Sequence, residues 1–126
     1  MDDSTVSVRY MVDDVAEAKA FYVTMFGFEV GFDAGRAFAE VRRGNLRLLL
    51  AGPTSSAGRP MPDGRQPAPG GWNRIHFLVD DIEAEVERLR SAGATFRNEI
   101  VTGPGGRQIL VDDPSGNPVE LFEPAG

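Results

Sequence analysis

The sequence predicts an α+β protein in which two tandem βαβββ units form a single domain of 126 residues. A short motif occurs twice, and each copy is followed by one helical pattern and three strand-like segments. Between the copies lies a stretch rich in Gly and Pro, which is typical of a loop. The predicted boundaries are 1–51 for the first unit, 52–71 for the loop and 72–126 for the second unit.

The repeated motif is Val-Asp-Asp followed by a β-branched residue, at residues 12–15 and again at residues 79–82. Each copy ends a run of β-branched and aromatic residues, which is typical of a strand. The second Asp of each copy, Asp14 or Asp81, stands where a helix N-cap is expected, and acidic residues follow in the next turn. The motif therefore predicts a passage from strand to helix in each unit.

The two predicted helices span residues 15–26 and 82–92, where apolar side chains recur at intervals of three and four. Gly27 and Gly93 follow them as expected stops. A unit of this kind buries only one face of its sheet, so we expect the two units to pair. The remaining predicted strands are 28–32, 37–42 and 46–51 in the first unit, and 95–101, 107–112 and 119–123 in the second.

The composition removes several function classes. A net charge of −6 argues against a basic surface for nucleic acid. With no Cys and the single His76, a thiolate nucleophile, a Cys-ligated metal and a multi-His site within one chain are excluded. No apolar run reaches the roughly 20 residues of a membrane span, so no membrane partner is expected. The acidic N-terminus lacks a signal-peptide core, which predicts a cytoplasmic protein.

The duplicated unit resembles the vicinal oxygen chelate superfamily, which includes glyoxalase I, extradiol dioxygenases, and fosfomycin- and bleomycin-resistance proteins. The resemblance implies a cup-shaped mixed sheet with the helices on the outside. It covers the chain except for the loop. The residues that carry it are the two Val-Asp-Asp motifs, Phe21-Tyr22, Phe26-Gly27, Leu89, Ala92-Gly93 and the segment 113–121.

In metal-dependent members of that superfamily, four strand positions of the cup hold a divalent cation. The resemblance places them at Ser7, Leu48, Arg74 and Glu120. Only Glu120 is an ordinary ligand, because a guanidinium donates hydrogen bonds and cannot coordinate a cation. We therefore expect no metal and no other cofactor, and a pairing of Arg74 with Glu120. Either the pair presents the remaining donors of Arg74 to a ligand, or it merely fills the former metal site.

Alternation along the strands from these positions predicts a cup with apolar walls and a few polar groups, as in organic-ligand pockets. Leucines that close the cup into a core are the alternative. Trp72 can stack on an aromatic ligand or pack beside the loop, and Arg107 follows a glycine-rich turn that can bind phosphate. The predicted ligand-binding residues are Arg9, Met11, Leu48, Leu50, Trp72, Arg74, His76, Arg107, Glu120 and Phe122.

Two functions of different classes follow. The leading prediction is metal-independent binding of a small organic molecule by a homodimer, similar to the bleomycin-resistance proteins that sequester a drug or metabolite. The alternative is a glyoxalase-like lyase or isomerase, or a dioxygenase-type enzyme. It would use His76 and Glu120 as catalytic groups, with or without a divalent metal. A regulatory domain with a filled cup is a third reading. The sequence leaves open the ligand's identity and charge, and whether the units pair within a chain or swap across a dimer.

Overall fold

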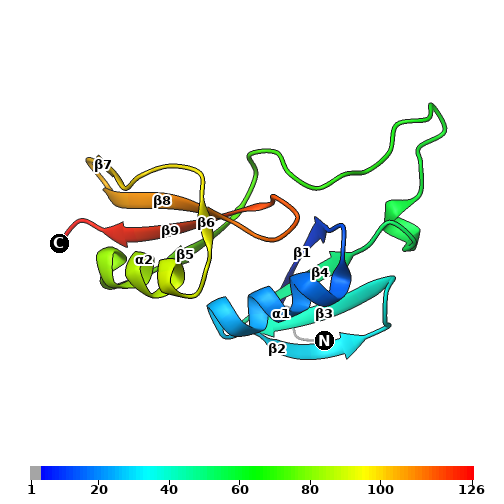
Figure 1. Cartoon of the computed structure of the whole chain (residues 1–126), viewed down its shortest axis with the longest axis horizontal. Helices are drawn as coiled ribbons and strands as arrows, with labels where there is room; N and C mark the ends of the chain where they lie inside the picture. Colours follow the sequence, from blue (N-terminus) through cyan, green and yellow to red (C-terminus); the bar gives the residue numbers. More distant parts are fainter. Residues whose placement is uncertain (1–3) are drawn as a thin grey trace. The chain divides into compact units, whose positions relative to one another are not determined.

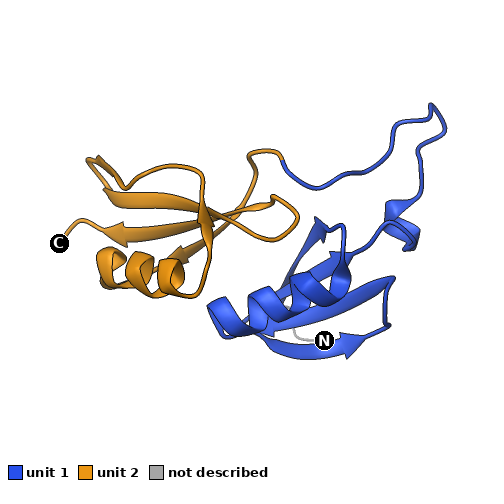
Figure 2. Cartoon of the chain, viewed as in Figure 1, with its two compact units in different colours: residues 1–70 blue, residues 71–126 orange. Residues whose placement is uncertain are grey.

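The computed structural model describes residues 4–126 of the chain, which forms two compact units, 1–70 and 71–126 (Figure 2). Each unit holds one helix and one mixed sheet (Figure 1). The sheets have four and five strands and neither is a closed barrel, so the predicted α+β class is confirmed. No helix in the described part of the chain is long and apolar enough to span a membrane.

The sheet of the first unit has the strand order β1-β4-β3-β2. Strand β1 runs parallel to β4, and the other neighbours are antiparallel. Helix α1 packs against β3 and β4. The elements of this unit are β1 (Val6–Met11), α1 (Val15–Phe26), β2 (Glu29–Asp33), β3 (Phe38–Arg43), β4 (Leu46–Ala51) and a short 3₁₀ turn, η1 (Ser56–Gly58), inside the predicted loop.

The sheet of the second unit has the strand order β5-β9-β8-β6, and β7 also pairs with β8. The predicted strand 95–101 is therefore broken into two. At the break, the backbone N–H of Leu110 donates to the side-chain oxygen of Asn98 at 2.9 Å, which replaces a backbone acceptor. The elements are β5 (Ile75–Leu78), α2 (Ile82–Ser91), β6 (Thr95–Phe96), β7 (Val101–Gly103), β8 (Gly106–Asp112) and β9 (Pro118–Pro124).

Both helices begin at the predicted N-caps. The Asp14 carboxylate accepts from the Glu17 N–H at 3.0 Å, and that of Asp81 accepts from the Ala84 N–H at 3.1 Å. Gly27 follows α1 with φ +70°, a left-handed conformation that most residues avoid. These contacts satisfy N–H groups that the first turn of a helix leaves without backbone partners.

Each unit has its own core between its helix and one face of its sheet. In the first unit, the rings of Tyr10 on β1 and Tyr22 on α1 lie 6.3 Å apart, which fixes the sheet face that meets the helix. We call the opposite face of each sheet its distal face. On the first sheet it carries Ser7, Arg9, Met11, Glu29, Glu40, Arg42, Arg47 and Leu49, and on the second His76, Leu78, Gln108, Leu110, Glu120 and Phe122.

Candidate ligand-binding site

The distal face of the second sheet brings together several predicted site residues. Parallel pairing of β5 with β9 places His76 directly opposite Glu120 and Leu78 opposite Phe122. Opposed residues on neighbouring strands have their side chains on the same face, within contact distance. Arg74 stands immediately before β5 and reaches the same carboxylate.

Glu120 is the centre of this group and is only 7% exposed. Its Oε1 accepts from Arg74 Nε at 3.0 Å and lies 2.9 Å from Arg74 Nη2. Its Oε2 lies 3.5 Å from Nε2 of His76. A buried carboxylate is costly without a cation, and the forked guanidinium supplies one together with hydrogen bonds. The predicted pairing of Arg74 with Glu120 is present in the structure.

Aromatic rings border the ionic group. The rings of His76 and Phe122 lie 5.1 Å apart at an interplanar angle of 33°. Trp72 is 69% exposed, and its carbonyl accepts from Arg74 Nη1 at 3.1 Å. Arg74 therefore links the buried carboxylate to the segment that carries the indole.

Arg97 holds Trp72 from a second direction and was missed by the sequence reasoning. Its guanidinium lies 4.7 Å from the indole centroid, a cation–π contact. The same guanidinium donates to Asp112 and to the carbonyls of Gly71 and Gly116. Nothing in the sequence pattern marks this residue, because its partners lie 15 to 26 residues away along the chain.

Two predicted leucines lie on the wrong face. Leu50 is the partner of Tyr10, whose ring contacts the helix, and Leu48 stands two residues earlier on the same side. Both are fully buried in the core. The distal face of β4 carries Arg47 and Leu49 instead. The prediction was wrong by one residue of register, and such a slip turns every side chain of a strand to the other face.

The same register corrects the family's metal position in the first unit. Glu120 is the partner of His76, two residues after Arg74. The matching partner of Arg9, two residues after Ser7, is Leu49, so this residue and not Leu48 corresponds to Glu120. Ser7, Leu49 and Arg74 offer at most one weak oxygen ligand beside Glu120, so the residues present do not fit the divalent metal. Among residues 4–126, no group of three or more His, Cys, Asp or Glu side chains could hold a metal ion.

Arg107 also lies on the wrong face for a ligand-binding role. Its partner on β9 is Glu123, which faces the helix, and its guanidinium donates to Glu123 and Glu83 at 2.8 Å. The other oxygen of Glu123 accepts from the Ile82 N–H at 3.0 Å, at the start of α2. Hydrogen bonds from the Ile82 N–H and the Arg107 guanidinium lower the pKa of Glu123, and they outweigh desolvation, which would raise it. Arg107 therefore anchors helix α2 to the sheet.

The first sheet carries an ionic group that the sequence reasoning did not find. Glu40 on β3 is 4% exposed, and its Oε2 accepts from Nε of Arg42 at 2.7 Å and from Nε of Arg47 at 2.5 Å. Burial alone would raise the pKa of Glu40, but the two arginines outweigh it and hold the pKa below its usual value. Alternation places Glu40 and Arg42 on one face of β3, but only the pairing of β3 with β4 brings Arg47 to them.

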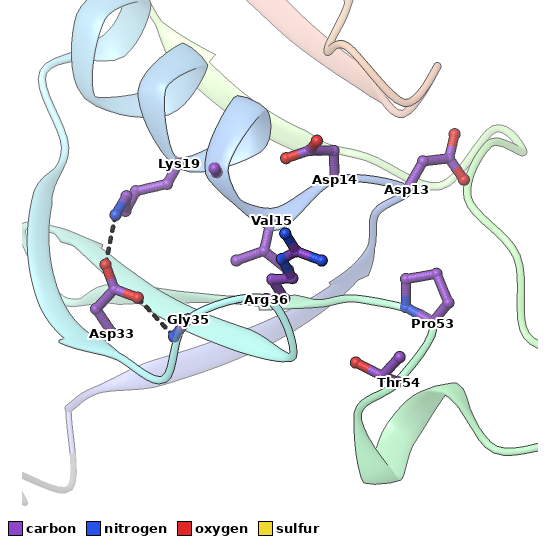
Figure 3. Close-up of a pocket in the computed structure, with 10 residues that line it drawn as sticks. Asp13, Asp14, Val15, Lys19, Asp33, Gly35, Arg36, Pro53 and Thr54 are labelled. Atoms are coloured by element: carbon purple, nitrogen blue, oxygen red, sulfur yellow. Dashed lines mark hydrogen bonds and ion pairs between the residues drawn. The ribbon is translucent and has the colours of Figure 1, made fainter.

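A separate hollow of about 800 Å³ opens beside the start of α1 (Figure 3). Its wall includes Lys19 ion-paired with Asp33, whose carboxylate also accepts from the Gly35 N–H at 2.9 Å. These bonds lower the pKa of Asp33. No predicted site residue lines this hollow. Its other lining residues are Asp13, Asp14, Val15, Ala16, Arg36, Pro53 and Thr54.

Comparisons with known proteins agree with this fold. The family described as Glyoxalase/Bleomycin resistance protein/Dioxygenase superfamily matches residues 5–121. The chain therefore belongs to this superfamily. It is 31% identical over 121 residues to the "uncharacterized protein YaeR" of Escherichia coli strain K12, with 92% of each chain covered.

Two solved structures are similar to this chain over nearly its whole length. The lactoylglutathione lyase from Agrobacterium tumefaciens is 25% identical, with a TM-score of 0.76 and coverage of 97% of this chain and 94% of the other. TnmS3, an antibiotic binding protein from Streptomyces sp. CB03234, is 27% identical, with a TM-score of 0.72 and coverage of 96% and 95%. One of these relatives is thus an enzyme and the other a binding protein, so the fold alone does not choose between the two functions.

Proposed function

We propose that the protein binds a small organic molecule at the distal face of its second sheet and that it does so without a metal ion. The observation that carries the proposal is the ion pair between the Arg74 guanidinium and the Glu120 carboxylate. Among the four positions that hold a metal in the family, Glu120 is the one with an ordinary metal ligand, and here it is bound to an arginine. Apolar rings beside a few polar groups are the usual lining of an organic-ligand site. Similarity to an antibiotic binding protein supports the same class of function.

Each residue has a distinct part in the proposed site. Arg74 exposes 28% of its side chain and offers hydrogen-bond donors in a fixed orientation, because Glu120 and the Trp72 carbonyl hold it. His76 exposes 45% of its side chain and can donate or accept. Arg97 lies against one face of the Trp72 indole, so a flat ligand would stack on the other face.

Fluorescence tests this proposal directly, because Trp72 is the only tryptophan of the chain. We expect one or more members of a panel of aromatic antibiotics, beginning with bleomycin, to change the Trp72 emission in a saturable way. Arg74→Gln should weaken that binding, since it removes the oriented donors. A panel in which no compound produces a saturable change would overturn the stacking role.

Arg107→Gln is the matched control. It also removes an arginine paired with a glutamate of β9, but on the helix face. We expect Arg107→Gln to lower stability and to leave ligand affinity within about twofold of wild type. A twofold change in affinity corresponds to only ~0.4 kcal/mol of binding free energy, which is too small for the loss of a direct contact. Equal weakening by both variants would mean that Arg74 acts only through folding.

Metal independence has its own test. Protein purified without chelators should contain no stoichiometric Ni, Zn, Fe or Mn, and added metal should not change ligand affinity. Stoichiometric metal that disappears in Glu120→Gln would overturn this part of the proposal.

The second candidate function is a lyase, favoured by the similarity to a lactoylglutathione lyase and by the His76–Glu120 contact of 3.5 Å. In that case His76 would exchange a proton with the substrate and Glu120 would orient the imidazole. An assay for lactoylglutathione lyase activity separates the two functions. Turnover lost in His76→Gln would establish the enzyme, and no turnover with intact ligand binding would favour the binding protein.

A homodimer is part of the proposal. Leu78 on the distal face of β5 is 67% exposed, and Phe32 on β2 is 56% exposed. The Phe32 ring lies 6.3 Å from that of Phe38 within the first unit, and exposed apolar side chains that cluster mark contacts between proteins. Sedimentation analysis should give a dimer, and Leu78→Glu should shift the population toward monomer. A wild-type chain that sediments as a monomer at all concentrations would contradict this.

A further inference from the structure

The distal face of the first sheet holds three arginines on three adjacent strands. Arg9 lies on β1, Arg47 on β4 and Arg42 on β3, in the strand order of the sheet. Arg47 is the direct partner of Arg42, and Arg9 is the partner of Leu49, two residues further along β4. Neighbouring strands are about 4.8 Å apart, so these long side chains share one surface.

Glu40 fixes two of the three guanidinium groups. A single oxygen of this buried carboxylate accepts from Nε of both Arg42 and Arg47. Gly31 on β2 leaves room for them, because a Cβ there would lie 2.8 Å from Arg42 Nε and 3.2 Å from Glu40 Cδ. The donors are therefore held in place before any ligand arrives, which lowers the entropic cost of binding.

This ionic group contains more arginines than carboxylates. One arginine is enough to neutralise one carboxylate. Among the described residues of this face, three arginines stand beside two glutamates, Glu40 and the exposed Glu29, which is the strand partner of Arg42. The difference is one positive charge, in a chain whose net charge is −6.

Unused donors point to the same conclusion. Within residues 4–126, the Arg9 side chain has no hydrogen bond or ion pair, and the Arg42 guanidinium donates only through its Nε, so its terminal amino groups have no acceptor. The side chain of Arg42 is 52% exposed, so these donors are accessible. A guanidinium with free N–H groups matches the geometry of a carboxylate or phosphate.

We infer that Arg9, Arg42 and Arg47, arranged around buried Glu40, form a site for the oxyanion group of a small organic acid. Leu49 lies between Arg9 and Glu40 on the same row of the sheet and offers an apolar contact for the body of that ligand. The site uses residues of the first unit only. None of these residues belongs to the second sheet.

Two-dimensional ¹⁵N–¹H NMR with benzoate and with inorganic phosphate as probes tests the inference. Saturable shifts should appear at residues 7–11 and 40–49 at probe concentrations up to about 10 mM, the range of weak specific binding. Saturation with benzoate only would assign a carboxylate ligand, and saturation with phosphate would extend the site to phosphorylated acids. Shifts that stay linear with both probes would overturn it.

Single variants identify the donors. Arg9→Gln and Arg42→Gln should each weaken binding about tenfold, the effect of losing one charge-assisted contact. Arg65→Gln is the charge-matched control, because Arg65 pairs with Asp63 in the exposed loop, and it should bind like wild type. Equal weakening by all three variants would show only a general charge effect and would overturn the site.

Two further variants keep the test independent of folding and of the proposed function. Gly31→Ala retains every charge but displaces Arg42, and it should weaken binding while the spectrum stays well dispersed. Arg74→Gln should leave unchanged the benzoate affinity that is measured from the shifts of residues 7–11 and 40–49. If Arg74→Gln abolished both benzoate binding and the Trp72 response, the oxyanion site would be wrong. Loss of the Trp72 response alone would concern the second sheet only.

Discussion

The distal faces of the two sheets use the same row of positions in different ways. In the first sheet the row runs Arg9, Leu49, Glu40 across β1, β4 and β3. In the second sheet the corresponding row runs His76, Glu120, Leu110 across β5, β9 and β8. Leucine and glutamate have exchanged strands between the two repeats.

The exchange shows which features of the repeat are required and which are free to vary. Both sheets bury one carboxylate on the distal face, and in both it is paired with arginine. Opposed residues on neighbouring strands lie within about 5.5 Å of each other, so either strand can supply the carboxylate to nearly the same place. The family's metal position is kept as Glu120 in one repeat and becomes Leu49 in the other.

The faces that pack against the helices, in contrast, should lose similar amounts of stability when a buried side chain is truncated. This loss is the largest effect that we expect. Leu50→Ala and Leu121→Ala each remove a buried leucine at equivalent positions and should destabilise by about 2–5 kcal/mol. Leu49→Ala, on the distal face, should cost less than half as much. Urea unfolding measures all three. A loss at Leu49 equal to that at Leu50 would contradict the observed register.

Moving the carboxylate of the first sheet from β3 to β4 tests whether the two strands are interchangeable. Glu40→Leu leaves Arg42 and Arg47 without their shared acceptor and should cost about 1–3 kcal/mol. Adding Leu49→Glu restores a carboxylate on the same row, opposite Arg9, as in the second repeat. The double variant should recover part of the lost stability in urea unfolding. A double variant less stable than Glu40→Leu would show that the two strands are not interchangeable.

The helix starts differ in a way that predicts unequal losses. Asp14→Ala removes the side-chain acceptor at the start of α1 and should cost about 1 kcal/mol. Asp81→Ala should cost less, because Glu123 still accepts from the Ile82 N–H at the start of α2. Thermal unfolding of both variants decides this. The reverse order would mean that Glu123 does not support the helix.

The smallest effect that we expect is on the pH dependence of stability in acid. The folded-state pKa of Glu40 lies below the ordinary glutamate value of 4.5, so its stabilising contribution is present above pH 4.5 and is lost as the pH falls through the lower folded value. Glu40→Gln should therefore flatten the decline of the urea midpoint between about pH 5 and pH 3. Glu123→Gln should do the same, since the pKa of Glu123 is also lowered. Unchanged slopes in both variants would contradict these shifts.

Local signals in the sequence were sufficient for much of the fold. The N-caps at Asp14 and Asp81 and the stop at Gly27 are set by contacts within a few residues, and the structure contains each of them. The pairing of Arg74 with Glu120 followed from the resemblance to the superfamily, which places both residues at metal-ligand positions of one cup, where a carboxylate without a metal needs another cation. The boundaries of strand 95–101 were not, since Asn98 interrupts it through a side-chain bond.

By itself the sequence determined the two repeats and where their helices begin, because both depend on local chemistry or on the repeat. The resemblance to the superfamily added the ionic pair at Glu120. Only the tertiary structure decided that Leu48, Leu50 and Arg107 face the helices, and that Arg42 and Arg47 meet at Glu40. The physical reason is strand register. A shift of one residue leaves the alternating pattern intact but exchanges the two faces of the sheet, and only the pairing of neighbouring strands fixes which face is which.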